Sequence, residues 1–201
     1  MSLHTQLQTY SVAIFASGSG TNAENICNYF KHHTFIKVCL IVTNNPHAGV
    51  IKRAEKLEVP LEVISKEIYN DVEKLTSLLK KYKTDFVVLA GYLKLIPAGL
   101  VEAFPARIIN IHPALLPKHG GKGMFGMHVH EEVKKAAEDK TGITIHYING
   151  RFDEGEIIFQ AETNVEVDDT PFVIAEKVHK LEYEYFPKVI EEVILKYQRN
   201  V

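Results

Sequence analysis

Two polar side chains stand two residues apart at the end of an apolar run, in the stretch IINIHPALLPKHGGKG. Asn110 and His112 alternate with isoleucines, and Pro113 ends the pattern. Residues two apart on a strand point to the same face, and an unpartnered amide or imidazole in a core costs free energy. The amide is a fixed hydrogen-bond donor, and the imidazole exchanges a proton near neutral pH. The pair could stabilise a developing oxyanion, or both groups could simply bond to nearby backbone.

A carboxylate beside the histidine would favour its charged form. Asp153, in the glycine-flanked segment GRFDEG, is our candidate because the segment follows an expected strand. Glu154 and Glu156 compete with it, since carboxylates in loops are usually solvated and their order along the chain does not rank them.

A second group of candidate residues is the glycine loop SGSGTN, which follows the first apolar run. Amides from Gly20 to Asn22 would point out of a helix N-terminus, where an anion such as phosphate is favoured. The spacing Gly18-x-Gly20-x-x-Ala23 also fits a relaxed dinucleotide fingerprint. Dinucleotide binding needs an acid after the second strand. The sequence has Thr43-Asn44-Asn45 there, which argues against a dinucleotide. A purely structural turn is the remaining alternative.

Three histidines, His119, His128 and His130, raise the possibility of a metal site. His128 and His130 begin an expected helix, and residues two apart on a helix do not share a face. No cysteine or aspartate cluster accompanies them, so we expect no metal.

The elements that must position these residues alternate along the first half of the chain. β-Branched apolar runs at 12–16, 37–43, 60–65, 86–91 and 106–112 predict strands buried on both faces. Helical patterns lie between them, at 21–32, 47–57 and 68–82. Thr21 and Glu24 form a capping-box pattern at the start of the first helix. This order predicts an α/β fold with an open, mostly parallel twisted sheet and right-handed crossovers.

The second half has a different pattern. Segments 142–150 and 156–165 predict an antiparallel pair of strands at the sheet's edge, because the connection between them is too short for a helix. Asp169-Thr170-Pro171 predicts the start of a long helix, which should run to about Tyr197 and kink at Pro187. We expect one domain over residues 1–201, with residues 1–10 as a flexible tail.

Composition limits the classes of partner. The chain has 201 residues, 46% of them hydrophobic and 24% charged, with a net charge of −2, which gives no support for a nucleic acid or an anionic membrane as partner. No apolar stretch approaches the length of a membrane helix, and residues 1–10 lack the pattern of a signal peptide. Cys27 and Cys39 are far apart in the sequence and predict reduced thiols in a cytosolic protein.

Taken together, four motifs resemble a known family: SGSGTN, VVLAGYLKLIP, INIHPALLPKHGGKGMFGMHVH and TIHYINGRFDEGEIIFQ. In this order they look like the phosphoribosylglycinamide formyltransferases of purine synthesis, which belong to the formyltransferase superfamily. The resemblance extends from Ser11 to about Pro187. It implies the formyltransferase fold with a Rossmann-like N-terminal half, 10-formyltetrahydrofolate as co-substrate, glycinamide ribonucleotide as acceptor, and no metal.

The resemblance also implies roles for individual residues. Those that match the family's catalytic positions are Asn110, His112 and Asp153. Those that match the phosphate site are Gly20, Thr21, Asn22 and His179, and Glu182 matches the position that contacts the substrate amine. Those that match the folate pocket are Leu93, Lys94, Leu95, Ile96, Ile148, Asn149, Gly150, Arg151 and Phe152. His146 matches a histidine near the phosphoribosyl group.

Some matches leave alternatives open. Spacing alone would make His179 and Glu182 a solvated helical face. Two departures from the family pattern concern fine contacts to folate: additional acids around Asp153, and a lysine at Lys94 where many members carry arginine.

The implied mechanism is attack of the glycinamide amine on the formyl carbon. Asn110 and a protonated His112 would stabilise the negative oxygen, and Asp153 would favour the charged imidazole and help move the amine proton. The glycines of residues 118–127 are compatible with a lid.

Four rival functions remain. Hydrolysis of formyltetrahydrofolate would use the same three residues on water, but those hydrolases carry an extra N-terminal domain. Methionyl-tRNA formylation needs a nucleic-acid-binding domain and a basic surface. A ligand-binding module would bind without turnover, and a dinucleotide oxidoreductase would need the missing acid. We expect a cytoplasmic monomer or homodimer, with no nucleic acid or membrane as partner.

Overall fold

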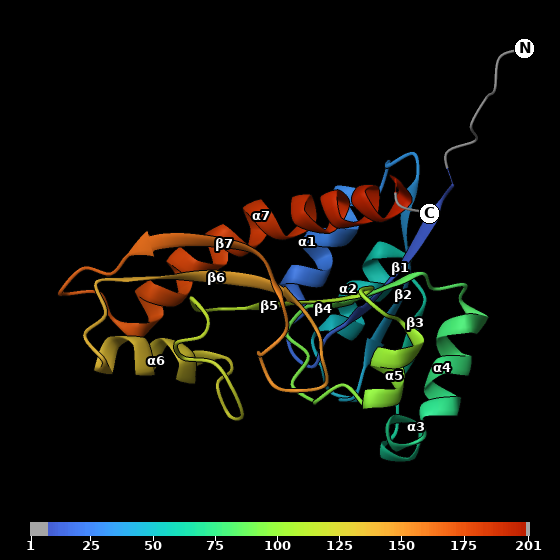
Figure 1. The fold of residues 1–201 in the computed structure, drawn as a ribbon, viewed down its shortest axis with the longest axis horizontal. Coiled ribbons are helices and arrows are strands. Elements are labelled where there is room, and N and C mark those ends of the chain that lie inside the picture. Colours follow the sequence, from blue (N-terminus) through green and yellow to red (C-terminus); the bar gives the residue numbers. More distant parts are fainter. Residues whose placement is uncertain (1–7, 200–201) are drawn as a thin grey trace, which may run out of the picture.

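The computed structural model describes residues 8–199, which form a seven-stranded sheet covered by helices on both faces (Figure 1). The strand order is β3-β2-β1-β4-β5-β6-β7. The strands are β1 (Tyr10–Phe15), β2 (Ile36–Thr43), β3 (Leu61–Val63), β4 (Phe86–Leu89), β5 (Ile108–His112), β6 (Lys140–Tyr147) and β7 (Ile157–Asn164). The first five are parallel, β6 pairs antiparallel with β5, and β7 pairs antiparallel with β6. The predicted fold is therefore confirmed.

Seven helices connect and cover the described strands. They are α1 (Thr21–Phe30), α2 (Val50–Leu57), α3 (Lys66–Asn70), α4 (Val72–Lys81), α5 (Ala98–Ala103), α6 (Met127–Lys135) and α7 (Pro171–Arg199). In Figure 1, α1 and α7 lie on one side of the sheet and α3, α4 and α5 on the other. None of the helices between residues 8 and 199 is long and apolar enough to cross a membrane.

The side chains of β1 alternate between the two faces of the sheet, and both faces are covered. Val12 and Ile14 belong to the core cluster that contains the residues of α1 and α7. Ala13 and Phe15 point the other way, into the cluster under α4 and α5. Because every residue of β1 is buried, the strand is apolar throughout.

The start of α1 differs from the capping-box prediction, which is wrong. Gly20 occupies the N-cap position in a left-handed conformation, and no side chain caps the helix. Glu24 instead forms an ion pair with Arg53 of α2. The carboxylate is therefore used to join two helices rather than to cap one.

Two other helix boundaries also differ. The helix expected from residue 47 begins at Val50, because Asn45 forms a turn with the backbone amides of His47 and Ala48. The single helix expected over 68–82 is two, α3 and α4. Asp71 separates them in an extended conformation, and its carboxylate accepts a hydrogen bond from Lys74 N at 3.0 Å.

Predictions for the two ends of the chain have different outcomes. Residues 1–7 of the expected tail lie outside the described residues. Its last residue, Tyr10, is buried and begins β1, so the tail predicted over residues 1–10 is wrong there. The long C-terminal helix α7 begins at Pro171, as expected, and contains Pro187 as a buried residue; the kink there stays a prediction.

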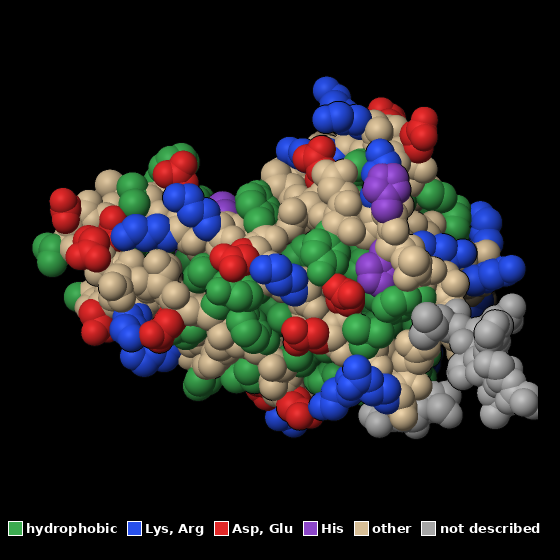
Figure 2. Space-filling model, turned by 90° about the horizontal axis from the view of Figure 1, so that it is seen from above, with side chains coloured by type: hydrophobic (Ala, Val, Ile, Leu, Met, Phe, Trp, Pro, Cys, Tyr) green, Lys and Arg blue, Asp and Glu red, His purple; other side chains and the backbone are tan. Residues whose placement is uncertain are grey.

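On the face seen in Figure 2, acidic and basic side chains are interspersed around an apolar centre.

Parallel strands place their carboxyl ends at one edge of the sheet. The glycine loop follows β1 there, the segment after Leu89 follows β4, and Asn110 and His112 end β5. Strand β6 runs the opposite way, so its register places His146 beside Asn110. All candidate catalytic elements therefore meet at the edge where open α/β sheets bind ligands.

Candidate active site

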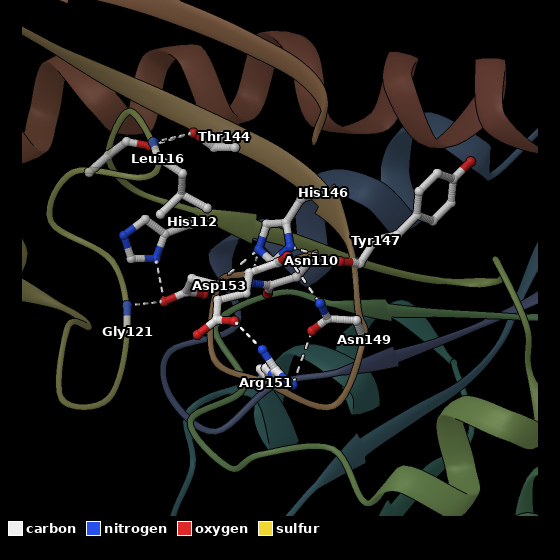
Figure 3. Close-up of polar contacts among 12 residues, drawn as sticks. Asn110, His112, Leu116, Gly121, Thr144, His146, Tyr147, Asn149, Arg151 and Asp153 are labelled. Carbon is white, nitrogen blue, oxygen red and sulfur yellow. Dashed lines mark hydrogen bonds and ion pairs between the residues drawn. The ribbon is translucent and has the colours of Figure 1, made fainter. Parts of the chain in front are cut away.

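Asn110 is held by a histidine from the neighbouring strand. Its Nδ2 lies 3.0 Å from His146 Nε2, and His146 Nδ1 lies 2.9 Å from the carbonyl oxygen of Tyr147 (Figure 3). Because a carbonyl only accepts, Nδ1 carries the hydrogen and Nε2 accepts from the amide. This bond fixes which way the Asn110 amide faces.

Asp153 is the carboxylate that lies beside His112. Its Oδ2 is 3.4 Å from His112 Nδ1 and accepts a hydrogen bond from Gly121 N at 2.9 Å (Figure 3). The competing Glu154 forms an exposed ion pair with Arg151 at 3.2 Å, and Glu156 is exposed. Geometry therefore selects Asp153 from the three acids.

The charge of Asp153 follows from its surroundings. Burial alone would raise the pKa of the carboxyl, but contact with His146, the charge of His112 and the Gly121 N–H together lower it. The group is therefore a carboxylate at neutral pH. Its backbone adopts a left-handed φ of 56°, which aspartate and asparagine tolerate better than most residues.

His112 is enclosed between two acceptors. Its Nε2 lies 2.8 Å from the carbonyl oxygen of His119, and its side chain is only 3% exposed. Burial lowers the pKa of His112, and Asp153 and the His119 carbonyl oppose that effect without reversing it. The ring is thus mainly neutral at pH 7, whereas the sequence led us to expect a protonated one.

The glycine loop is shaped by α2. Gly20 has a φ of 77°, and a Cβ added there would lie 2.4 Å from Val50 Cγ2. Val50 N donates to Gly18 O at 3.1 Å, and Arg53 Nε donates to Ser19 O at 2.9 Å. Only glycine fits position 20, and the loop leaves the first amides of α1 free to bind an anion.

The residues after β2 support the same loop. Ser17 Oγ donates to Asn44 Oδ1 at 2.7 Å, and Asn45 Nδ2 donates to Ser17 O at 3.4 Å. Where a dinucleotide-binding protein carries its ribose-binding acid, this chain therefore carries amides that hold the glycine loop.

Glu182 forms a cluster with residues of α1 and α7. Asn22 Nδ2 donates to Glu182 Oε2 at 2.9 Å, and His179 Nδ1 lies 2.8 Å from the same oxygen. The hydrogen bond to Glu182 raises the pKa of His179. Glu182 is 4% exposed, so the alternative of a solvated helical face is wrong for it. The Asn22 side chain is bonded to Glu182, which leaves its backbone amide for a phosphate.

The segment after β4 contains the first half of the expected folate pocket. Leu93 and Leu95 are 45% and 36% exposed, whereas Ile96 is buried. Lys94 is exposed. Leu93 N donates to Ser17 Oγ at 3.0 Å, so this segment is attached directly to the base of the glycine loop.

The second half of that pocket is the turn between β6 and β7. Asn149 Oδ1 accepts from Arg151 N at 3.1 Å, and Asn149 Nδ2 donates to Glu154 O at 3.0 Å. Gly150 has a φ of 84°. Ile148 packs against the core, and Phe152 is half-buried. The turn is held by its own side chains and ends at Asp153.

The three histidines of the metal alternative have separate surroundings. His119 Nε2 lies 3.2 Å from Glu138 Oε1, and His128 Nδ1 lies 3.6 Å from Glu131 Oε2. His130 is buried. Within residues 8–199, no group of three histidine, cysteine or acidic side chains could hold a metal ion.

Several contacts of the site were absent from the sequence-based prediction. The Gly121 amide and the His119 carbonyl are backbone groups of residues 118–127, and side-chain patterns do not identify them. Thr144 Oγ1 donates to Ala114 O at 2.7 Å and accepts from Leu116 N at 2.9 Å, so it holds the segment after His112 in place. In the sequence, the only signal for these Thr144 hydrogen bonds was a threonine within an apolar strand.

Comparisons with known proteins identify relatives over almost the whole chain. The family model described as formyl transferase matches residues 10–190. The chloroplastic phosphoribosylglycinamide formyltransferase of Arabidopsis thaliana is 40% identical over 91% of this chain, which covers 66% of that relative, or about two thirds of its length. The phosphoribosylglycinamide formyltransferase of Bacillus subtilis is 34% identical, with 90% of this chain and 93% of the relative covered.

A solved structure agrees with these relatives. The crystal structure of phosphoribosylglycinamide formyltransferase from Bacillus halodurans superposes with a TM-score of 0.82 at 36% identity. The superposition covers 92% of this chain and 95% of the Bacillus halodurans chain.

Proposed function

The chain belongs to the formyl transferase family, and from that premise we propose that it transfers a formyl group from a folate donor to the amine of glycinamide ribonucleotide. The family implies a folate-derived donor, and we take 10-formyltetrahydrofolate as that donor. The reaction would be the formyl transfer step of purine biosynthesis that the relatives' names describe.

One observation carries the proposal: an amide, an imidazole and a carboxylate converge at the end of β5. The His112 ring lies 3.4 Å from Asp153, and Asn110 is held by His146 at 3.0 Å. The second N–H of Asn110 Nδ2 has no acceptor among residues 8–199, so it is available to the formyl oxygen. A preorganised donor of this kind stabilises charge that develops on a carbonyl.

The His112–Asp153 pair would handle the proton. Because His112 is mainly neutral before the reaction, the pair can take up the proton that the amine loses as its nitrogen bonds to the formyl carbon. Two groups this close titrate as a unit. The ring then faces two acceptors, Asp153 Oδ2 and the His119 carbonyl, which stabilise its charged form. The pair returns the proton to the departing folate nitrogen when its bond to the formyl carbon breaks.

The ligand sites lie on either side of this pair. Backbone amides of Gly20, Thr21 and Asn22 would bind the phosphate, His179 would stand near it, and Glu182 would contact the amine. The folate would lie between residues 93–96 and residues 148–152. Exposed Leu93 and Leu95 are suited to an apolar ring system, because apolar side chains line most small-molecule sites. The folate supplies the formyl carbon, and the chain supplies its orientation.

We further propose that residues 1–201 form one catalytic domain that works as a monomer or homodimer in the cytosol. The free thiols Cys27 and Cys39 support a reducing compartment.

The test is an absorbance assay for loss of 10-formyltetrahydrofolate, run with and without glycinamide ribonucleotide. We expect turnover only when the nucleotide is present. Turnover without it would favour the hydrolase, and binding of either ligand without turnover would favour a binding module.

A further inference from the structure

Glu138, in the turn between α6 and β6, takes no part in the proposed chemistry, yet it holds two consecutive side chains near His112. Its carboxylate oxygens accept hydrogen bonds from Lys118 Nζ at 3.1 and 2.9 Å. His119 Nε2 donates to Oε1 at 3.2 Å, because a carboxylate only accepts. The hydrogen bond from Lys118, aided by that from His119 and opposed by burial, lowers the pKa of Glu138. A charged carboxylate therefore anchors one end of the segment 118–121.

The segment 118–121 contacts both members of the proton-handling pair. The carbonyl oxygen of His119 lies 2.8 Å from His112 Nε2, and Gly121 N donates to Asp153 Oδ2 at 2.9 Å. Figure 3 shows that same carboxylate oxygen between His112 and Gly121. The position of this short segment therefore sets the geometry of the imidazole and of the carboxylate together.

Two features indicate that the segment needs an anchor. His119 has a φ of 53°, a left-handed conformation that costs free energy in a residue with a side chain. Residues 115–119 and 138–141 line a cavity of about 340 Å³, so these two stretches of the chain do not pack closely against each other there. The hydrogen bonds of Glu138 join the two stretches where apolar packing does not.

The His119 carbonyl decides which nitrogen of neutral His112 carries the hydrogen. A neutral imidazole has one N–H and one bare nitrogen, and a carbonyl oxygen only accepts. The 2.8 Å from Nε2 to this oxygen is a normal hydrogen-bond distance, whereas the 3.4 Å from Nδ1 to Asp153 Oδ2 is longer than one. The hydrogen is therefore on Nε2, and the bare Nδ1 faces Asp153. A proton that the pair takes up is then held between Nδ1 and the carboxylate.

We propose that Glu138 is a positioning residue for the proton-handling pair. By anchoring the segment 118–121, it keeps the His119 carbonyl on His112 Nε2 and leaves Nδ1 bare beside Asp153. Without the anchor, the hydrogen of the neutral ring would move to Nδ1, where the carboxylate accepts it. The pair would then have lost its site for the incoming proton. This inference rests on the proposed function, because it concerns the same proton.

The experiment compares Glu138→Ala with the wild type by NMR and by kinetics. Near neutral pH, the ring nitrogen shifts of ¹⁵N-labelled histidines distinguish the two neutral tautomers, and the His112 signals are those absent from the spectrum of His112→Asn. We expect the hydrogen on Nε2 in the wild type and a measurable fraction on Nδ1 in Glu138→Ala. We also expect kcat to fall by about 10-fold, which is part of the contribution of general acid–base catalysis, while KM stays within about threefold of the wild type.

A conservative variant tests whether the anchor can be restored. In Glu138→Gln the amide oxygen can still accept from Lys118, so kcat should stay within about threefold of the wild type. If Glu138→Ala does not fold in thermal unfolding, His119→Gly takes its place. Glycine adopts the left-handed φ at no steric cost, keeps the carbonyl and loses only the side chain that Glu138 holds, so the tautomer should shift in the same direction.

The matched control is Glu132→Ala. Glu132 pairs with Lys135 on α6 at 3.2 Å, so this variant also loses a pair of an acid and a lysine, but outside the segment 118–121. It should keep the wild-type kcat and the wild-type tautomer of His112.

The outcomes separate the two proposals. Hydrogen on Nδ1 in the wild type, or an unchanged His112 tautomer in the folded Ala or Gly variant, would overturn the role of Glu138 and leave the proposed function standing. A fall in kcat without a change of tautomer would also overturn it, because a general loss of structure has that effect. Absence of nucleotide-dependent turnover in the wild-type protein would overturn the proposed function and this inference together.

Discussion

Replacing Asp153 by asparagine tests the proton-handling pair with little other change. Asparagine has nearly the same shape as aspartate, and it tolerates the left-handed φ of 56° at this position. The variant removes the negative charge that lies 3.4 Å from His112 Nδ1. Its amide oxygen can still accept the hydrogen bond from Gly121 N, which Asp153 Oδ2 accepts at 2.9 Å.

The expected loss follows from Coulomb's law at that distance. The attraction between a carboxylate and a charged imidazole at this separation is about 5 kcal/mol at an effective dielectric constant of about 20, and about 1 kcal/mol in water. Losing about 5 kcal/mol would lower the rate a few thousand-fold, and losing about 1 kcal/mol would lower it about 5-fold. Because the Asp153 side chain is 12% exposed, we expect a value between them, with kcat reduced by about 100-fold.

The assay is the absorbance change of the folate under saturating nucleotide, with thermal unfolding recorded in parallel. Glu154→Gln is the matched control, because Glu154 is the neighbouring acid and pairs only with exposed Arg151. If Asp153→Asn kept more than half of the wild-type kcat, or changed KM alone, the proton-handling role of Asp153 would be refuted.

Three further predictions concern other parts of the site. Asn110→Ala should lower kcat by about 10²–10³-fold and leave nucleotide binding within a fewfold by calorimetry; unchanged turnover would contradict the oxyanion role. Gly20→Ala should cost about 1–3 kcal/mol for its left-handed backbone, in addition to the clash with Val50, and should raise the KM for the nucleotide. Gly18→Ala is the control, because its added Cβ meets nothing within 4 Å. Equal unfolding temperatures of the two variants would argue against the backbone strain and the clash at position 20. His130 has a pKa of about 4 in the folded protein, below its ordinary 6.5. As the pH falls, the unfolded chain therefore binds a proton before the folded protein does, and stability is lost between these two pKa values. Urea unfolding should therefore show that the wild type loses about 2 kcal/mol more than His130→Phe between pH 7 and pH 5, and parallel losses would contradict the buried neutral ring.

Patterns of period two account for what the sequence predicted well. β-Branched runs identified the parallel strands, and alternation placed Asn110 and His112 on one face at the end of β5. The order of elements then placed the glycine loop and these two residues at the same edge of the sheet. These features depend on local composition and chain order, which a single sequence displays directly.

Contacts between distant segments account for what the sequence left open. Which acid faces His112 depends on the backbone conformation of the turn between β6 and β7, and the pattern of charges does not encode it. Asn22 and Glu182 are 160 residues apart and meet through the packing of α1 against α7. The capping-box prediction at Thr21 failed for a similar reason, since Glu24 pairs with Arg53 of another helix.

The most direct test of the central claim is to follow the formyl carbon itself. The protein would be incubated with 10-formyltetrahydrofolate labelled with ¹³C in the formyl group and with glycinamide ribonucleotide, and the products observed by NMR. We predict that the label appears as a formamide on the nucleotide, at a rate about 100-fold lower in Asp153→Asn. Label released as free formate, at the same rate with or without the nucleotide, would contradict the account.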